Sequence, residues 1–498
     1  MRCIDQVRTL EVSQSINYTT DGKFISQNVK FNRNIQFYTP IINPKIKYFY
    51  YPSCKETILA AYMKRHKPVI LEEYDENIDL FPFMKKYHVQ SKSWDEQTYI
   101  QSMKPPSKSA MYQRAYEKYL QDHRIRYTVT PFTKIEKMKT TKYKAPRLIQ
   151  AYDPMFNIKF GRHIKALEHK TISHKKIGKH FGKGTTELIS NKILYFSKKY
   201  KWYTEGDHKS FDAHVTDEQN AATHRSYAAC TQHDKELQKM AKKTRVNKCM
   251  SQSGDRYKIK GTVMSGSPDT SFKNCKINLA ILDRTIAVYR LTNPLFRGEA
   301  IVNGDDFIIF SNYAIDIKLF ASLLRCCNME CELLPSTNVI TNVSFCGSKL
   351  CICENGQSLL IHDFTKVLDT FGMTHRVNVD RERYLNDLAI CFAYMHAHEP
   401  IGHAFSTAFN IKITPNNIPI PNTVEDKLQY IMSTLTIPFI STGIITDSIY
   451  RAYPDIDKWI SKIHALPSLI KSKTSSTPIN VHIDHNNEQI SVTETNLK

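Results

Sequence analysis

The sequence lacks the cysteine spacings of a zinc site or of a small disulfide-stabilised domain. Its twelve cysteines include no Cys-x-x-Cys pair, although Cys326, Cys327 and Cys331 lie close together, as do Cys351 and Cys353. A chain of 498 residues is also long enough to bury a large core without disulfides. We therefore expect reduced, mostly buried thiols, as in a cytosolic compartment.

Long apolar runs are also missing. The first residues, MRCIDQVRTLEVSQS, contain no apolar segment of the signal-peptide type. No stretch approaches the roughly 18 apolar residues that a helix needs to cross a bilayer. The sequence therefore predicts a soluble protein, whose attachment to a membrane would be peripheral or through a partner.

Acidic residues are scarce relative to basic ones. Lys and Arg total 69 against 48 Asp and Glu, so the formal net charge is +21. Such an excess favours a polyanionic partner, because neutralised phosphates release counterions and drive binding. The alternative is a basic protein without a nucleic-acid partner, and charge alone does not decide between the two.

The length predicts two to four lobes, or one large domain with subdomains. Residues 94–121 predict two helices that a Pro-Pro pair separates. Strand and helix signals alternate over about 200–350, and helical periodicity over 380–396 begins a helical C-terminal part. The polar segment 471–498 has few aromatics and is expected to be disordered.

Two aspartates follow an expected strand at residues 200–203. Asp207 and Asp212 lie on the turn that leaves this strand, before a helical pattern that starts near Thr216. A strand end holds a carboxylate rigidly and lets it face a cleft, so the first aspartate could bind a metal and the second the substrate. The alternative is a pair of solvated surface carboxylates, because this spacing is common.

A second acidic pair, Asp305-Asp306, lies between the apolar runs 300–302 and 307–310. Such runs predict a buried hairpin, in which Gly304-Asp305 could simply form the turn. Adjacent acids between buried strands repel each other unless cations lie between them. A magnesium ion, which prefers oxygen ligands, would neutralise that repulsion.

A polar loop, 265–270, lies between the two acidic clusters. Thr270 and Asn274 are four residues apart and share one face at the start of an expected helix. Their side chains suit the recognition of sugar hydroxyls, whereas the alternative is ordinary helix capping. In this order, the three clusters predict the palm of a template-directed polymerase.

Five segments resemble motifs of the RNA-dependent RNA polymerases of positive-strand RNA viruses, above all of the tombusvirus-like group. DHKSFDAHV (207–215), SGSPDTSFKN (265–274) and NGDD (303–306) are similar to motifs A, B and C. KIEKMKTTKYKAPRLIQ (134–150) resembles the basic motif F, and SFCGSKL (344–350) resembles the motif E hairpin beside the primer.

The resemblance implies an α+β right-hand polymerase, with an antiparallel palm sheet flanked by helices and with fingertips that close the hand. The expected parts are an N-terminal extension or fingertips at 1–90, fingers with the basic nucleotide-binding segment at 91–206, a palm at 207–350 with a fingers insertion at 216–262, a helical thumb at 351–470 and the disordered tail at 471–498.

The resemblance also implies nucleotidyl transfer with two Mg²⁺ ions, for which Mn²⁺ could substitute. Asp207 and Asp305 are the expected principal metal ligands, and Asp306 is a supporting ligand or lies just behind them. All three aspartates are the expected catalytic residues. The residues expected to sense the ribose 2′-hydroxyl are Asp212, Ser265, Thr270 and Asn274.

Four basic residues of motif F are expected to meet the nucleotide. Arg147 and Lys144 would contact the triphosphate, and Lys134 and Lys137 would line its path to the site. Arginine suits this task because its planar fork binds phosphate oxygens in pairs. A basic run is otherwise a solvated face.

Phe345 and Cys346 are expected in the hairpin beside the primer. The segment 326–334 departs from the family pattern, because it lacks the lysine that usually serves as a general acid. Lys318 and Lys349 are available, but neither matches the pattern.

The expected partners are a single-stranded RNA template, nascent RNA, nucleoside triphosphates and other viral or host replication proteins, in the host cell cytoplasm with peripheral recruitment to membranes. A reverse transcriptase is the nearest enzymatic alternative, but Asp212 with Asn274 favours ribonucleotides. A non-enzymatic RNA-binding replication factor would explain the charge, yet it gives no reason for Asp305-Asp306 between apolar strands.

Overall fold

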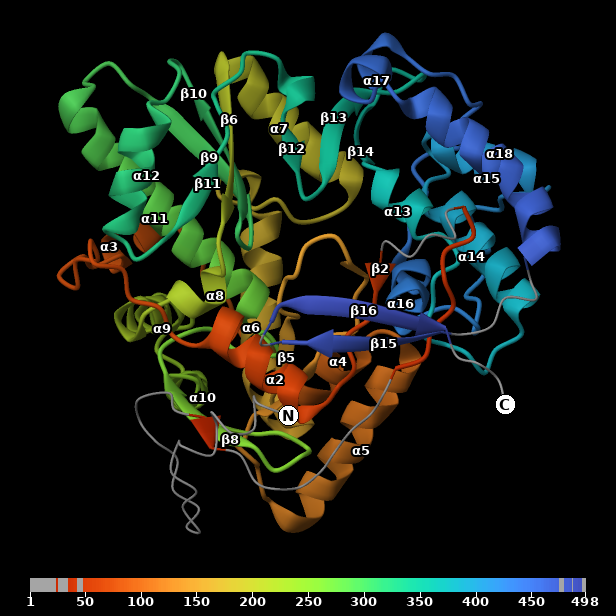
Figure 1. The fold of residues 1–498 in the computed structure, drawn as a ribbon. Coiled ribbons are helices and arrows are strands. Elements are labelled where there is room, and N and C mark those ends of the chain that lie inside the picture. Colours follow the sequence, from red (N-terminus) through yellow and green to blue (C-terminus); the bar gives the residue numbers. More distant parts are fainter. Residues whose placement is uncertain (1–23, 26–34, 43–47, 474–478, 486, 495–498) are drawn as a thin grey trace.

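The computed structural model describes residues 24–25, 35–42, 48–473, 479–485 and 487–494. Helices and strands are mixed throughout, as expected for an α+β chain (Figure 1). A four-stranded sheet lies on one side of the molecule, and helices from the last part of the chain form the other side. In the described residues, no helix is both long and apolar enough to span a bilayer, and the cysteines are free thiols, most of them buried.

The four-stranded sheet is antiparallel, with the strand order β11-β6-β10-β9. Its strands are β6 (Trp202–His208), β9 (Gly298–Asn303), β10 (Asp306–Ser311) and β11 (Cys331–Leu333). The expected hairpin is the β9–β10 pair, and Gly304 in its turn has a φ of +70°, which residues with a Cβ rarely adopt. In the register, Asp207 lies opposite Asp306 on one side and opposite Glu332 on the other.

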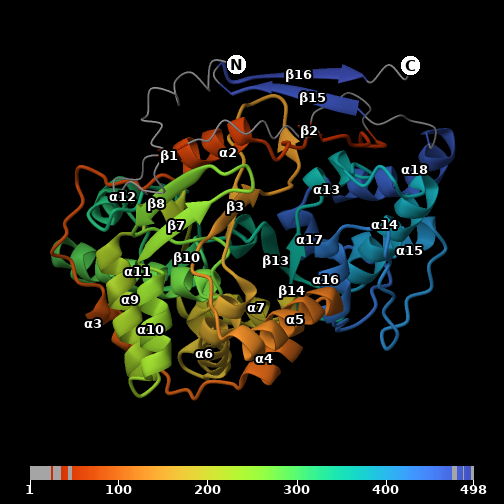
Figure 2. The ribbon, with the colours of Figure 1, turned by 90° about the horizontal axis from the view of Figure 1, so that it is seen from below.

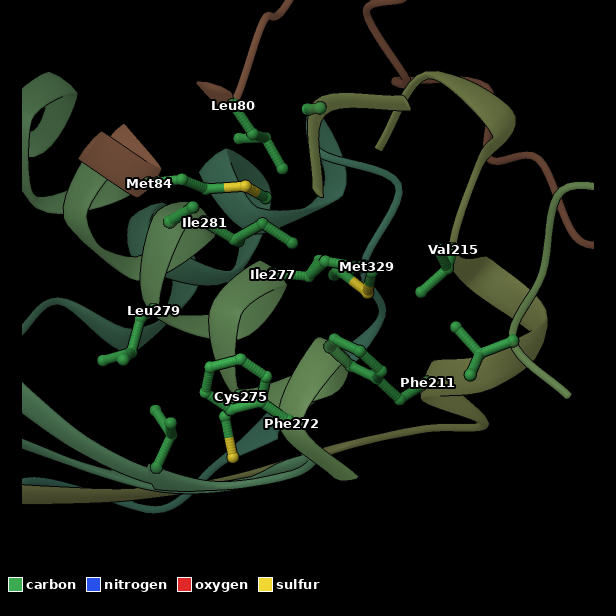
Figure 3. Packing of buried hydrophobic residues seen from close by; sticks show 14 of the residues in the cluster. Leu80, Met84, Phe211, Val215, Phe272, Cys275, Ile277, Leu279, Ile281 and Met329 are labelled. Atoms are coloured by element: carbon green, nitrogen blue, oxygen red, sulfur yellow. The ribbon is translucent and has the colours of Figure 1, made fainter. Parts of the chain in front are cut away.

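Alternate residues of β10 pack against two different layers. Phe307 and Ile309 join the main core with α11 (Thr270–Thr292), whereas Ile308 and Phe310 join a second cluster with α7 (Thr186–Lys199). The strands carry apolar side chains on both faces because a layer covers each face of the sheet. This packing holds the ends of the strands in place. Figure 3 shows the side chains of α11 among residues of three other segments, Leu80, Met84, Phe211, Val215 and Met329.

The segments around this sheet are mostly helical. The two helices expected beside the Pro-Pro pair are α4 (Glu96–Gln101) and α5 (Pro106–Asp122), which pack on α6 (Pro154–Ser173). The helix expected near Thr216 is α9 (Asp217–Cys230), which Thr216 begins with a capping box. The other elements here are β1 (Phe24–Ile25), α3 (Phe81–Met84), η2 (Lys85–Tyr87), η3 (Gly178–His180), α8 (Phe211–His214), α10 (Lys235–Lys243), β7 (Val246–Met250), β8 (Arg256–Lys260) and α12 (Ile317–Arg325).

Two short strand pairs carry the basic segment. β3 (Thr130–Thr133) pairs with β5 (Leu148–Ala151), and β4 (Met138–Lys139) pairs with β2 (Tyr48–Phe49). The residues between β4 and β5 are irregular. The elements that follow β2 along the chain are α2 (Lys55–Ala61) and the π-helical turn η1 (Tyr62–His66).

The last part of the chain has a hydrophobic core of its own. Phe371, Leu385 and Trp459 belong to this core, which is separate from the core around α11. The helix expected at 380–396 is α14 (Arg381–Met395). The other elements are η4 (Ile340–Asn342), β12 (Ser344–Phe345), β13 (Ser348–Ile352), β14 (Ser358–His362), α13 (Thr365–Asp369), α15 (Pro400–Ala408), α16 (Asp426–Thr434), α17 (Asp447–Ala452) and α18 (Ile456–Lys473).

Residues near the N-terminus pair with the beginning of this helical part. Tyr38 and Thr374 exchange two backbone hydrogen bonds of 2.8 and 3.4 Å, and the Ile41 N–H donates to the Phe371 carbonyl at 2.9 Å. The Arg381 guanidinium stacks over the Tyr38 ring, 4.4 Å from its centroid. The N-terminal region therefore links the basic segment to the helical part of the molecule.

The expectation that residues 471–498 are disordered is wrong for the part that the structure describes. α18 continues to Lys473, and β15 (Ile479–Asp484) and β16 (Gln489–Glu494) form an antiparallel hairpin. Apolar and polar residues alternate in INVHID and QISVTE, which is the period of a strand. The polar composition of the tail hides this local pattern.

The turn region of the β15–β16 hairpin lies beside α2 and β2 (Figure 2). His485 forms hydrogen bonds with the Thr57 hydroxyl at 3.1 Å and with the Tyr143 hydroxyl at 2.9 Å. Its ring also stacks on Tyr51 at 5.6 Å. The hairpin is thus held against the N-terminal elements and the basic segment.

Candidate active site

Three aspartates meet at one end of the central sheet. Asp207 is near the end of β6, Asp306 begins β10, and the two are directly opposite each other in the register. Asp305 lies in the β9–β10 turn and is exposed, as is Asp207. The structure therefore brings together the three acids that the sequence predicted as catalytic.

Burial and then repulsion between the carboxylates shape the electrostatics of this cluster. Burial, and then the charges of Asp305 and Asp207, raise the pKa of Asp306 to about 6. Burial and the charge of Asp305 also raise the pKa of Asp207, against the opposing effect of Lys144. In the described part of the chain, no Lys, Arg or His lies within 4.0 Å of these carboxylates. The described residues therefore supply no direct cationic partner for these carboxylates, although the Cys346 thiol forms a hydrogen bond with Asp306.

The carboxylates fit a divalent cation with a preference for oxygen. Among the described residues, no three His, Cys, Asp or Glu side chains converge as a ready-made metal site. Magnesium, however, keeps several of its waters and needs only one or two protein carboxylates. A cation between Asp207 and Asp305 would also relieve the repulsion that raises the pKa of Asp306.

Two of the four residues expected at the ribose are joined. The Asn274 amide donates to Asp212 Oδ1 at 2.7 Å, which connects the start of α11 to α8. Burial raises the pKa of Asp212 to about 6, and the hydrogen bond from Asn274 opposes this increase. The bond from Asn274 thus fixes the position of the Asp212 carboxylate, and the same bond together with burial sets its pKa.

The two hydroxyls of the same expected group have backbone partners instead. Ser265 Oγ donates to the Leu148 carbonyl at 2.9 Å and accepts from the Gln150 N–H at 3.1 Å. Thr270 Oγ1 donates to the Met264 carbonyl at 2.7 Å. The Ser265 bonds attach the polar loop to β5, and the Thr270 bond lies within the loop itself. The loop is therefore held against the basic segment.

Arg147 is paired with an acid of its own segment. Its Nε donates to Glu136 Oε1 at 3.0 Å, and its Nη2 donates to Glu136 Oε2. This pairing raises the pKa of Arg147, with further contributions from Asp305 and Asp212. Lys134 lies 4.0 Å from the same glutamate. The charge of Arg147 therefore acts on Asp305 in the acidic turn and on Asp212 beside α11.

The other two lysines that were expected to meet the nucleotide, Lys137 and Lys144, lie in different places. Lys144 is exposed, and its charge acts on Asp207. Lys137 instead donates to the Thr370 carbonyl at 3.1 Å and to its hydroxyl at 3.4 Å. Burial lowers the pKa of Lys137 to about 8. The structure thus places Lys137 at the contact with the helical part rather than beside the aspartates.

The β12–β13 hairpin borders the acidic turn. Phe345 is buried against the central sheet, whereas Cys346 is exposed in a left-handed conformation with a φ of +53°. The Asn303 amide donates to Cys346 Sγ at 3.2 Å. Of the two lysines considered as a general acid, Lys349 donates to the Ala452 carbonyl, and Lys318 is exposed on α12.

Sequence reasoning missed a buried link between β6 and the acidic turn. The Asn278 amide donates to the Gly304 carbonyl at 3.0 Å, and its Oδ1 accepts from His208 Nε2 at 3.0 Å. Burial lowers the pKa of His208 to about 4, so the ring is neutral at pH 7. Asn278 follows Asn274 by one helical turn, and that spacing was the signal available in the sequence.

Two basic residues near the site were missed as well. Lys183 donates to Asn303 Oδ1 at 3.3 Å and to the Ser271 hydroxyl. Arg65 Nη1 donates to the Ala145 carbonyl at 3.1 Å. Neither residue lies in a segment that resembles a motif, so no sequence signal pointed to them.

Comparison with known proteins decides the family. A sequence profile described as viral RNA-dependent RNA polymerase matches residues 83–417. The match includes the acidic cluster, the basic segment and the β12–β13 hairpin. The chain belongs to this polymerase family. The membership implies the right-hand polymerase fold and the use of divalent metal ions.

Relatives of the chain confirm its resemblance to the tombusvirus-like group. The RNA-directed RNA polymerase of melon necrotic spot virus is 26% identical over 296 residues, which cover 52% of this chain and 34% of that protein. The enzyme of oat chlorotic stunt virus (isolate United Kingdom) is 26% identical over 342 residues, 61% of this chain and 43% of that protein. The enzyme of tobacco necrosis virus (strain A) is 30% identical over 237 residues, 44% of this chain and 31% of that protein. The chain thus matches less than half the length of each of these relatives.

Proposed function

We propose that the chain is an RNA-directed RNA polymerase that copies a single-stranded RNA template and so replicates a viral RNA genome. The 3′-oxygen of the nascent RNA attacks the α-phosphorus of a nucleoside triphosphate. A new oxygen–phosphorus bond forms, the bond to pyrophosphate breaks, and the hydroxyl proton leaves. Base pairing and backbone contacts, rather than base-specific side chains, select the template.

One observation carries this proposal: a cationic segment acts on the same carboxylates that meet at the β9–β10 turn. Lys144 acts on Asp207, and Arg147 acts on Asp305. A triphosphate with its cations has the charges to bind between such groups, with phosphate oxygens toward the basic side and cations toward the acidic side. A protein that only bound RNA would gain nothing from the carboxylates at the β9–β10 turn.

In this proposal, Asp207 and Asp305 hold two Mg²⁺ ions, and Asp306 supports them. Bound ions of this kind lower the pKa of the attacking hydroxyl and neutralise the leaving phosphates. Mn²⁺ has the same preference for oxygen ligands and can substitute.

The Asp212–Asn274 pair senses the 2′-hydroxyl of the incoming nucleotide. A site built to hydrogen-bond a hydroxyl rejects a substrate without it, because its polar groups are left unpaired. Ser265 and Thr270 act on this pair through the loop that they hold. Arg147 and Lys144 bind the triphosphate.

The parts of the right hand follow from the same assignment. The central sheet is the palm and the helical part is the thumb. The N-terminal residues close the fingertips onto the thumb, supported by the Tyr38–Thr374 backbone pair and the Lys137–Thr370 contact. Other viral or host replication proteins are further partners, and the host cell cytoplasm, with peripheral attachment to membranes, is the proposed location.

The experiment that tests this function uses the purified chain, a primed RNA template, ribonucleotides and Mg²⁺. Wild type should extend the primer to the end of the template, and Asp305→Ala should not. Deoxyribonucleotides should be incorporated at least about 100-fold less efficiently. RNA binding by both proteins with no extension by wild type would favour a non-enzymatic role instead. Efficient deoxyribonucleotide use would favour a different polymerase class.

A further inference from the structure

An arginine outside the family match lies beside the basic segment. Arg65 is on the π-helical turn Tyr62–His66, and the matched region begins at residue 83. The Lys67 N–H donates to the Tyr62 carbonyl at 2.8 Å, and the Tyr62 ring lies 4.3 Å from Tyr257. Such turns are rare and often occur at functional positions. The turn fixes the direction in which Arg65 leaves the helix.

This turn holds the basic segment on both sides of Arg147. Arg65 Nη1 donates to the Ala145 carbonyl at 3.1 Å, and the Leu148 N–H donates to His66 Nε2 at 3.0 Å. Burial, with the charges of Arg65 and Arg147, lowers the pKa of His66 to about 4. The neutral ring therefore accepts at Nε2 at physiological pH. Arg65 and Arg147 are thus fixed relative to each other.

The two arginines differ in their partners. The guanidinium of Arg147 is engaged with Glu136 through two nitrogens. Arg65 is half-buried, but within the described residues it has no carboxylate within 4.0 Å, and only its bond to Ala145 is formed. A partly buried cation without a counter-charge is costly, so an anion bound there would stabilise it. Among the more distant charges, Arg147 opposes that of Arg65, whereas Glu136 and then Asp305 favour it, so the guanidinium also lies in the field of the acidic turn.

We propose that Arg65 is a further substrate-binding residue, whose free N–H groups bind the phosphate oxygens of the incoming nucleoside triphosphate and of the pyrophosphate that leaves. The inference rests on the proposed function, because it adds a residue to the same substrate site. A guanidinium suits this ligand, because its fork binds two phosphate oxygens at once and keeps its charge when partly buried. An RNA phosphodiester has the same chemistry, so the test must separate the two sources.

The test compares Arg65→Gln and Arg65→Lys with Arg225→Gln. Arg225 is a control because it lies on α9 and pairs with Asp79. Primer extension by one nucleotide gives KM and kcat, and added pyrophosphate gives an inhibition constant. Arg65→Gln should raise both KM and the pyrophosphate inhibition constant about 10- to 100-fold. Arg65→Lys should have an intermediate effect, and the control should match wild type.

Affinity for the primed RNA, measured by fluorescence anisotropy, separates nucleotide from RNA binding. It should stay within about twofold of wild type in Arg65→Gln. A loss of RNA affinity with an unchanged KM would assign Arg65 to the RNA backbone, and no change in either would give it no binding role. Both outcomes overturn the proposal.

A direct binding measurement tests the role of Arg65 even if the proposed function fails. If wild type extends no primer, the proposed function fails, and calorimetry of pyrophosphate with Mg²⁺ decides the role of Arg65. Binding that is weaker in Arg65→Gln than in wild type would support the inference, and equal binding would contradict it. If Arg65→Gln does not fold, Arg65→Lys gives the same comparison with the charge retained.

Discussion

At the scale of single residues, the site is defined by charges that folding leaves unbalanced. Burial raises the pKa values of Asp207 and Asp306, which lie opposite each other on neighbouring strands, and the charge of Asp305 raises both further. The sequence predicted these aspartates because acids between apolar runs are unusual. Asn278 was not predicted, because its only sequence signal was a spacing of one helical turn after Asn274. Only the folded chain shows that it supports the Gly304 turn.

Replacing Asp306 by asparagine should stabilise the metal-free protein while it lowers activity. The pKa of Asp306 rises from 3.8 to about 6 on folding, so the native state holds this proton to a higher pH than the unfolded state does. Titration of Asp306 therefore destabilises wild type as pH rises from about 4 to about 6, and the variant lacks this contribution. Above pH 6 the variant should be more stable by on the order of 1 kcal/mol, allowing for solvent screening.

Thermal melts from pH 4.5 to 7.5 without divalent cations test this expectation. The difference in Tm between Asp306→Asn and wild type should grow with pH and level off above pH 6. Mg²⁺ should stabilise wild type more than the variant. A difference that is constant across this range would show that Asp306 does not titrate as described.

Replacing Asn278 by leucine should lower kcat and leave KM for nucleotides largely unchanged. The change leaves His208 and the Gly304 carbonyl without their partner, so the acidic turn is less well held. Loss of such buried hydrogen bonds costs about 1–3 kcal/mol, or roughly 10- to 100-fold in rate if the effect falls on the transition state. Steady-state primer extension measures both constants. The control is Asn293→Ala at the other end of α11, which should match wild type.

At the scale of elements, local patterns predicted what local sequence determines. The β9–β10 hairpin, the start of α11 at Thr270 and the two helices beside the Pro-Pro pair all follow from periodicity and turn residues. Contacts between distant segments could not be predicted in this way. Ser265 binds the backbone of β5, and Lys137 binds Thr370, because the folded chain brings those partners close.

Gly266→Ala should lower both activity and stability. Gly266 lies against β5, and an added Cβ would be 2.5 Å from the Gln150 carbonyl oxygen and 2.7 Å from the Ala151 Cα. A glycine-to-alanine change in an unstrained loop usually stabilises a protein, so the opposite sign would report the close contact. Primer extension and thermal melts measure the effect.

The control for this change is Gly356→Ala. Gly356 has a φ of +80° and no atom within 4 Å of an added Cβ, so the substitution strains the backbone without a clash. It should lower the Tm slightly and leave primer extension unchanged. Equal loss of activity in both variants would mean that the β5 contact has no special role.

At the scale of the whole molecule, the ends of the described chain tie its parts together. Tyr38 pairs with Thr374 near the C-terminal helices, and His485 binds Tyr143 of the basic segment. The sequence did not predict either contact, because the N-terminal region has little periodicity and the tail looked disordered. Both contacts depend on segments far apart in the chain.

Lys137→Met should loosen the contact between the basic segment and the helical part. The change removes the hydrogen bonds to Thr370 but keeps the aliphatic stem. Amide hydrogen exchange should rise at residues 370–374 and stay unchanged in the central sheet. Lys142→Met, at an exposed position of the same segment, is the control. No local increase relative to that control would show that Lys137 does not hold this contact.

The most direct measurement of the central claim is incorporation of a single nucleotide on four primed RNA templates that differ only in the next template base. Each template should direct addition of its complementary ribonucleotide by wild type, with Mg²⁺ present. Asp207→Asn should bind the same RNA and add none, because the acidic cluster has lost a principal carboxylate. Addition that ignores the template base, or equal addition by Asp207→Asn, would contradict a template-directed polymerase centred on these aspartates.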